Sequence, residues 1–104
     1  MARSSEFLYV IRPTRLQMVT DAPTADETEI LSRHAAYLEK LTEDGTVVLY
    51  GRTQNRDGTT FGIVIFRARD ESQAERIMEN DPAVKERIMR AELYPYRIAM
   101  MRTA

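Results

Sequence analysis

Two short segments of the chain are apolar at nearly every position instead of alternating with polar residues. They span residues 7–12 and 61–66 and are rich in β-formers, and Pro13 stops the first of them. Adjacent residues in a strand point to opposite faces of a sheet, so Val64 and Ile65 place one large aliphatic side chain on each face. Such strands belong to sheets that are covered on both faces. We therefore predict two strands of a sheet that needs a cover on each side.

A capping box predicts where the first helix begins. Thr24 and Glu27 have the spacing at which each side chain can accept a hydrogen bond from the other residue's backbone amide. Gly45 suits the end of this helix, because glycine readily adopts the left-handed conformation of a C-terminal cap. Residues at steps of three and four should form the stripe that faces the sheet: Leu31, His34, Ala35, Leu38 and Leu41.

A second, shorter helix is expected after the second apolar strand. Ser72 and Glu75 offer another capping box, and the helix should end at Asp81, since a residue that precedes proline avoids helical geometry.

Pro95 in the last strand indicates a sheet edge or a bulge. The remaining expectations are strands over residues 46–50 and 93–101, a hairpin connection over residues 53–60 and an irregular loop over residues 13–23.

The resulting order, β-α-β-β-α-β, predicts an α+β, ferredoxin-like domain with a four-stranded antiparallel sheet. Right-handed crossovers place both helices on one face of that sheet. The other apolar face then needs its own cover, and a second copy packed sheet on sheet as a homodimer is the simplest one. The alternative is that the loop over residues 13–23 folds across this face. At 104 residues the chain has room for one such domain.

Composition argues against several classes of function. The chain has 15 basic and 16 acidic residues and a net charge of -1, so no basic surplus points to a nucleic-acid partner. It has no cysteine and one histidine, which argues against disulfides, thiolate catalysis and a metal site, and is compatible with a reducing cytoplasm. The N-terminal apolar run is too short for a secretory signal or a membrane span, so we expect a cytoplasmic protein without a membrane partner.

Several of these residues, taken in order, resemble the YCII-related (YciI-like) family over nearly the whole chain. They are residues 8–11, Arg33-His34, Tyr37-Leu38, Leu41, Gly45, Gly51 and residues 81–84. The resemblance implies a single domain over residues 1–104 with its core at 6–101, assembled as a dimeric α+β barrel. It also implies a candidate acid–base pair, His34 and Asp81. We expect the protein to work without a cofactor. Arg87 stands where the family often has glycine, and Arg52 stands where it often has glycine or proline after Gly51. A bulky charged side chain at either place would narrow or reshape a pocket.

The predicted topology brings this pair to one edge of the sheet. Strands ending at Arg12 and Arg52 share that edge, and the end of the second helix delivers Asp81 to it. His34 lies about 10 residues into the first helix, roughly 15 Å along its axis, so contact with Asp81 is feasible. An aspartate that accepts a hydrogen bond from one imidazole nitrogen raises the basicity of the other, as a general base requires. Arg12, Arg52 and Tyr50 could then bind a small anionic or phenolic ligand.

Structural explanations of the same residues stay open. A histidine on a sheet-facing stripe is often a satisfied core residue, and Asp81 before Pro82 is a ready N-cap. The sequence therefore leaves open whether the protein is an enzyme. One hypothesis is a cofactor-independent isomerase or lyase that uses His34 and Asp81 on a small cyclic or phenolic metabolite. The other is a non-catalytic module that binds a small ligand or another protein, and an oxygenase related to haem or quinol enzymes is a third.

Overall fold

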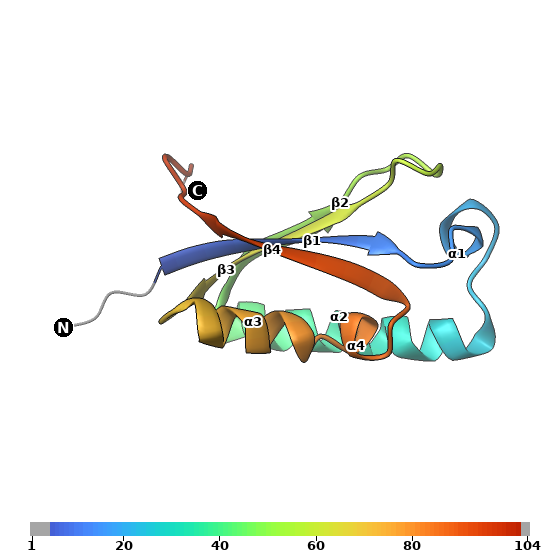
Figure 1. Cartoon of the computed structure of the whole chain (residues 1–104), viewed down its shortest axis with the longest axis horizontal. Coiled ribbons are helices and arrows are strands. Elements are labelled where there is room, and N and C mark those ends of the chain that lie inside the picture. The colour runs from blue at the N-terminus through green and yellow to red at the C-terminus, as the bar shows by residue number, and fades with distance from the viewer. Residues whose placement is uncertain (1–4, 103–104) are drawn as a thin grey trace.

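The computed structural model describes residues 5–102, which form a sheet with helices packed on one side of it (Figure 1). The elements follow one another as β1 (Ser5–Pro13), α1 (Gln17–Thr20), α2 (Ala25–Glu43), β2 (Val47–Arg52), β3 (Gly62–Ala68), α3 (Glu71–Glu79), α4 (Pro82–Lys85) and β4 (Met89–Tyr96). No helix within residues 5–102 is long and apolar enough to cross a membrane.

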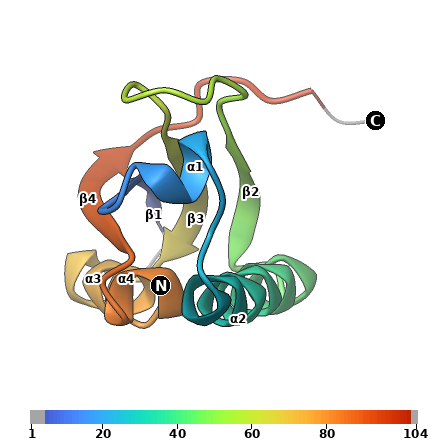
Figure 2. The ribbon, with the colours of Figure 1, turned by 90° about the vertical axis from the view of Figure 1, so that its right-hand side faces the viewer.

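The four strands form one antiparallel sheet in the order β2-β3-β1-β4. The two predicted apolar strands, β1 and β3, lie at its centre, and β4 is an edge strand, as Pro95 indicated. Figure 2 shows α2, α3 and α4 together beneath the sheet. The ferredoxin-like α+β class predicted from the order of elements is therefore confirmed.

The core lies between the sheet and the helices. Alternate residues of the central strands supply it, including Phe7 and Tyr9 from β1 and Phe66 from β3. The ring of Phe66 lies 6.0 Å from that of Phe7 and 5.6 Å from that of Tyr9, measured between centroids. Leu38 of α2 and Ala74 of α3 close this layer from the helix side. This side of the sheet is called the inner face below.

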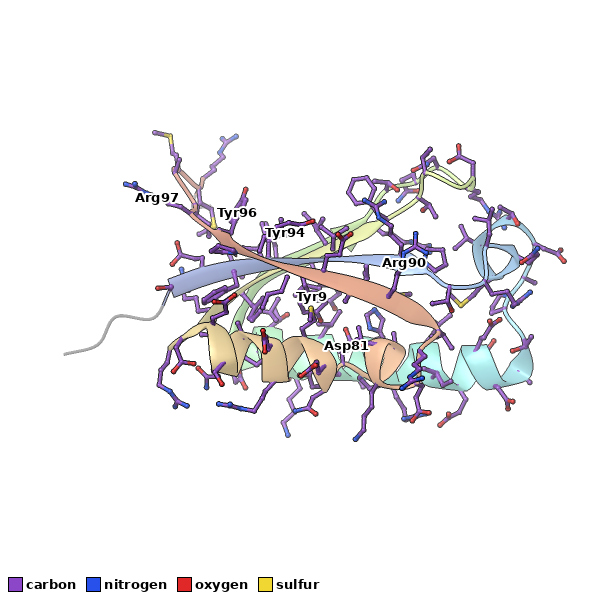
Figure 3. All side chains as sticks on the ribbon, in the orientation of Figure 1. Tyr9, Asp81, Arg90, Tyr94, Tyr96 and Arg97 are labelled. Carbon is purple, nitrogen blue, oxygen red and sulfur yellow. The ribbon has the colours of Figure 1, made fainter. Side chains whose placement is uncertain are left out.

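The opposite side, called the outer face below, is also largely apolar. The strand register places on it Leu8, Val10, Leu49, Ile63, Ile65, Tyr94 and Tyr96. Figure 3 shows Tyr94 and Tyr96 on the side of the sheet away from the helices. The loop over residues 13–23 lies beyond the end of β1 and contains α1, so it does not cover this face (Figure 1). Within residues 5–102 no helix covers the outer face either.

Helix α2 begins and ends where the sequence predicts. The Thr24 hydroxyl accepts from the Glu27 amide at 3.1 Å, and the Glu27 carboxylate accepts from the Thr24 amide at 2.8 Å. Gly45 has a φ of +88° directly after the C-cap residue. The predicted stripe is wrong at Ala35, which is exposed, because it falls one residue past His34 and points away from the sheet.

Two other boundaries differ from the prediction. The N-cap of α3 is Asp70, whose carboxylate accepts from the Gln73 amide at 2.8 Å, so the capping box at Ser72 and Glu75 is wrong. Strand β4 begins at Met89 and not at residue 93, and it ends at Tyr96. Residues 89–92 alternate between apolar and charged side chains, which is the pattern of a strand with one covered face, so the predicted start at residue 93 is wrong.

Candidate functional site

Asp81 is the centre of the candidate site. It follows α3 and is the N-cap of α4, and it is 0% exposed. Its Oδ2 accepts a hydrogen bond from the Tyr9 hydroxyl at 2.7 Å, and its Oδ1 accepts one from the Ala83 amide at 3.0 Å. Oδ1 also lies 2.6 Å from Nδ1 of His34. A buried carboxylate is costly unless it is paired and hydrogen-bonded, and these partners together meet that requirement.

His34 lies on α2 with its side chain 15% exposed. Because Asp81 accepts at Nδ1, the neutral imidazole keeps its proton there and leaves a lone pair on Nε2. Within residues 5–102, Nε2 makes no hydrogen bond. Every buried side-chain nitrogen or oxygen in the same range has a hydrogen-bond partner, so Nε2 is not a buried atom. Nε2 is therefore open to solvent, while Nδ1 is held by a buried acid.

Two tyrosines surround the pair. Burial, and then the charge of Asp81, raise the pKa of Tyr9 far above its usual value, so its hydroxyl stays protonated as a donor to Asp81. Burial, and then Asp81, also raise the pKa of Tyr37 to about 12, and its hydroxyl donates to the Ile77 carbonyl at 2.6 Å. Figure 3 shows Tyr9 and Asp81 between the sheet and the helices.

Tyr9 was not among the predicted site residues. The signal that could have found it is chemical: a tyrosine in the middle of an apolar central strand must find a partner for its hydroxyl. Tyr9 occupies such a position in β1 and is 0% exposed. The identity of that partner depends on a contact across 72 residues of sequence, which no local pattern reveals.

A cavity of about 310 Å³ lies beside His34 on the inner face. Most of its walls are aliphatic, from Ile11, Leu31, Leu38, Val64 and Met89. Polar groups come from His34, Tyr50, Arg52 and Thr60. The cavity therefore presents one open imidazole nitrogen, a phenol, a guanidinium and a hydroxyl within an otherwise apolar surface. We call it the His34 cavity.

A bulge in β2 places Tyr50 and Arg52 at this cavity. Val47 pairs with Phe66 and Leu49 pairs with Ile65, so the register shifts by one residue between them. Beyond the shift, Tyr50 pairs with Val64 and Arg52 with Gly62, both on the inner face. Without the bulge, the alternation of the strand would direct these two side chains to the outer face.

Arg12 does not reach the His34 cavity. It follows Ile11 on β1 and pairs with Arg90 of β4, so its side chain belongs to the outer face. There its guanidinium lies 5.3 Å from the ring centroid of Phe61, a cation–π contact. The structure thus brings together His34, Asp81, Tyr50 and Arg52 from the sequence-predicted set and places Arg12 on the other side of the sheet.

A second cavity of about 540 Å³ adjoins the first, between residues 18–23 and the connection after β2. Two arginines hold the α1 segment that walls it. Arg56 donates from Nε to the Val19 carbonyl at 3.0 Å. Arg15 donates to both carboxylate oxygens of Glu27, at 2.9 and 2.5 Å, and these hydrogen bonds lower the pKa of Glu27 to about 2. Glu27 was predicted as a capping residue, and no local pattern in the sequence indicates this ion pair.

A metal centre finds no support in the arrangement of side chains. In the part of the chain that the structure describes, no group of three or more histidine, aspartate or glutamate side chains is placed to hold a metal ion. His34 and Asp81 meet each other directly instead.

Comparison with known families and structures gives a consistent result for the fold. The model of the YCII-related domain matches residues 9–96. No curated protein sequence matches the chain.

Among solved structures, 5-chloro-2-hydroxyhydroquinone dehydrochlorinase from Burkholderia phenoliruptrix, in complex with 2,5-dihydroxybenzoquinone, has a TM-score of 0.62 and 18% identity. That likeness covers 88% of this chain and 93% of the dehydrochlorinase chain. An uncharacterised protein from Thermotoga maritima has a TM-score of 0.56 and 9% identity, over 91% of this chain and 100% of its own. At such identities these likenesses show the fold alone.

Proposed function

The chain belongs to the YCII-related family, and on that premise we propose that it is a small cofactor-independent enzyme of isomerase or lyase type. His34 acts as the acid–base group, and Asp81 orients it. The observation that carries the proposal is the asymmetry of the imidazole: Nδ1 is held by a buried carboxylate, whereas Nε2 is open beside an apolar cavity. A structural histidine has no need of an open nitrogen at a cavity.

The chemistry follows from this asymmetry. Nε2 removes a proton from a bound ligand, and Asp81 stabilises the imidazolium that forms. In an elimination, the electron pair left on the ligand forms a double bond and expels a leaving group from the neighbouring carbon as an anion. In an isomerisation, the imidazolium returns the proton to a different carbon of the same ligand. Either sequence balances with the ligand and His34 alone.

A small cyclic or phenolic ligand fits the cavity best. A volume of about 310 Å³ with mainly aliphatic walls suits one ring, and Tyr50 and Arg52 can bind its polar substituents. The similar fold of a dehydrochlorinase whose name describes a chlorinated hydroxyhydroquinone supports a ring of this kind. In such a reaction the expelled anion would be chloride.

The test is turnover of 5-chloro-2-hydroxyhydroquinone and related chlorinated hydroquinones, followed by chloride release. His34→Gln should lower the rate by about 100-fold or more, since general acid–base groups contribute on that scale. Arg33→Gln is the matched control, because the neighbouring Arg33 pairs with Glu29 on the exposed side of the same helix. Turnover that survives in folded His34→Gln would contradict the proposal.

A second candidate, a non-catalytic binding module, has an observation of its own. Asp81 caps α4 and accepts from Tyr9, so the carboxylate has structural duties apart from His34. If these were its only duties, His34→Gln would lower the melting temperature and change ligand binding, and no ring substrate would be turned over by the wild-type protein.

Assembly as a homodimer is part of the same proposal. The outer face is apolar at its centre, where Val10 pairs with Ile63, and it is flanked by charged residues of both signs: Glu6, Glu92, Arg12, Arg67 and Arg90. A two-fold contact joins the same patch on both copies. A patch that carries both acidic and basic residues can therefore pair opposite charges across such a contact. A second copy of this chain is therefore the occupant we propose for the outer face.

A further inference from the structure

We propose that Arg52 is an anion subsite that selects ring ligands carrying a single carboxylate, with the ring beside His34. This inference rests on the proposed function and names the substrate class of the same site. It starts from the position of Arg52, whose side chain the β2 bulge directs to the inner face. Within residues 5–102, Arg52 makes no side-chain hydrogen bond or ion pair, whereas Arg15, Arg33 and Arg56 each hold a partner.

Arg52 stands where the two cavities meet. The His34 cavity and the second cavity share five lining residues, Arg52 among them, so the two cavities adjoin at this side chain. The His34 side is aliphatic. The other side is more polar, with the side chains of Gln54 and Asn55 in its wall. A ligand that spans the boundary would keep its ring in the aliphatic part and extend a polar substituent toward the guanidinium.

The charge of the surroundings limits the substituent to one negative charge. Arg56 lines the polar part, but its guanidinium already donates to the Val19 and Asp21 carbonyls. Asp21 lines the same part and adds a negative charge. Arg52 and Arg56 carry two positive charges and Asp21 carries one negative charge, so the net charge of the lining suits a monoanion better than a doubly charged phosphate. The planar fork of arginine matches the two oxygens of a carboxylate.

The subsite is tested with phenol, 3-hydroxybenzoate and 4-hydroxybenzoate, because each acid differs from phenol by one carboxylate. Binding is measured by calorimetry and by the NMR signals of the single His34 ring. One of the two acids should bind the wild-type chain about fivefold more tightly than phenol, the scale of a solvent-exposed ion pair. Arg52→Gln should abolish that preference, so that the acid and phenol bind the variant with similar affinity.

Arg12→Gln is the matched control, since it removes the same charge from the same end of the sheet on the outer face. The preference should survive in this variant. A preference that persists in Arg52→Gln, or that is also lost in Arg12→Gln, would overturn the subsite. Equal binding of phenol and both acids, with His34 signals that shift, would overturn the subsite and leave the proposed function standing. If no probe shifts the His34 signals at millimolar concentration, both inferences fail.

Discussion

Nδ1 of His34 and Oδ1 of Asp81 lie 2.6 Å apart, although 47 residues separate them in the sequence. The contact joins the middle of α2 to the turn between α3 and α4. Asp81 is held from two other directions, by the Tyr9 hydroxyl and by the Ala83 amide, so it cannot rotate away from the imidazole. The interpretations of Asp81 as a helix cap and as the partner of His34 are therefore compatible, because one carboxylate does both.

Tyr9→Phe tests how much the carboxylate depends on the tyrosine. The ring would keep its packing on Phe66, but Asp81 would lose its donor at Oδ2. A buried acceptor left without a partner costs ~1–3 kcal/mol, so the free energy of unfolding should fall by that amount in a denaturant titration. Tyr37→Phe is the control and should cost less, because the Ile77 carbonyl that it releases is neutral. Equal losses in the two variants would contradict this account.

The tautomer of His34 provides a second prediction. Because Asp81 accepts at Nδ1, the nitrogen chemical shifts of the only histidine should show the proton on Nδ1 in the neutral wild-type protein. In Asp81→Asn the charged acceptor is gone, and the side-chain amide can still cap α4, so the fold should remain while the fraction of Nε2–H tautomer rises. An unchanged tautomer in this variant would show that Asp81 does not orient the ring.

Some features of this site can be predicted from residues that are neighbours in the sequence, and others depend on contacts between distant segments. The capping box at Thr24 and Glu27 and the Asp81-Pro82 pair each depend on neighbouring residues, so both were predicted correctly. Arg12 was predicted to lie beside Arg52 at the site, but simple alternation places it on the outer face, because Ile11 before it faces the core. The places of Tyr50 and Arg52 do not follow from alternation, since a bulge reverses it in β2, and a bulge depends on pairing with β3. The Arg15–Glu27 ion pair likewise requires the path of a loop that has no periodic pattern.

That ion pair leads to a prediction about acid stability. The pKa of Glu27 is lowered from its usual 4.5 to about 2 by the hydrogen bonds from Arg15 and then from Thr24. A group whose pKa is lower in the folded state stabilises the fold above its unfolded pKa and loses that effect as the pH falls. Stability should therefore decline from about pH 4.5 toward pH 2. Thermal unfolding across this range should show a flatter decline in Glu27→Gln.

The matched control for this experiment is Glu29→Gln on the same helix. Glu29 forms an exposed ion pair with Arg33, and exposed pairs contribute little to stability. Its variant should decline with pH as the wild-type protein does. If Glu27→Gln and the wild-type protein lost stability in parallel below pH 4.5, the Arg15–Glu27 pair would not be the cause.

The outer face provides the last prediction, which concerns assembly. Sedimentation of the wild-type chain at micromolar concentration should give the mass of a dimer, because the central strands leave apolar side chains on a face that no helix within residues 5–102 covers. Val10→Glu places a charge at the centre of that face, beside Ile63, and should shift the equilibrium to monomers. Ala36→Glu adds the same charge on the exposed side of α2 and should leave the dimer intact. A wild-type monomer would contradict the proposed assembly whatever Val10→Glu does, so the test stands even if that variant fails to fold.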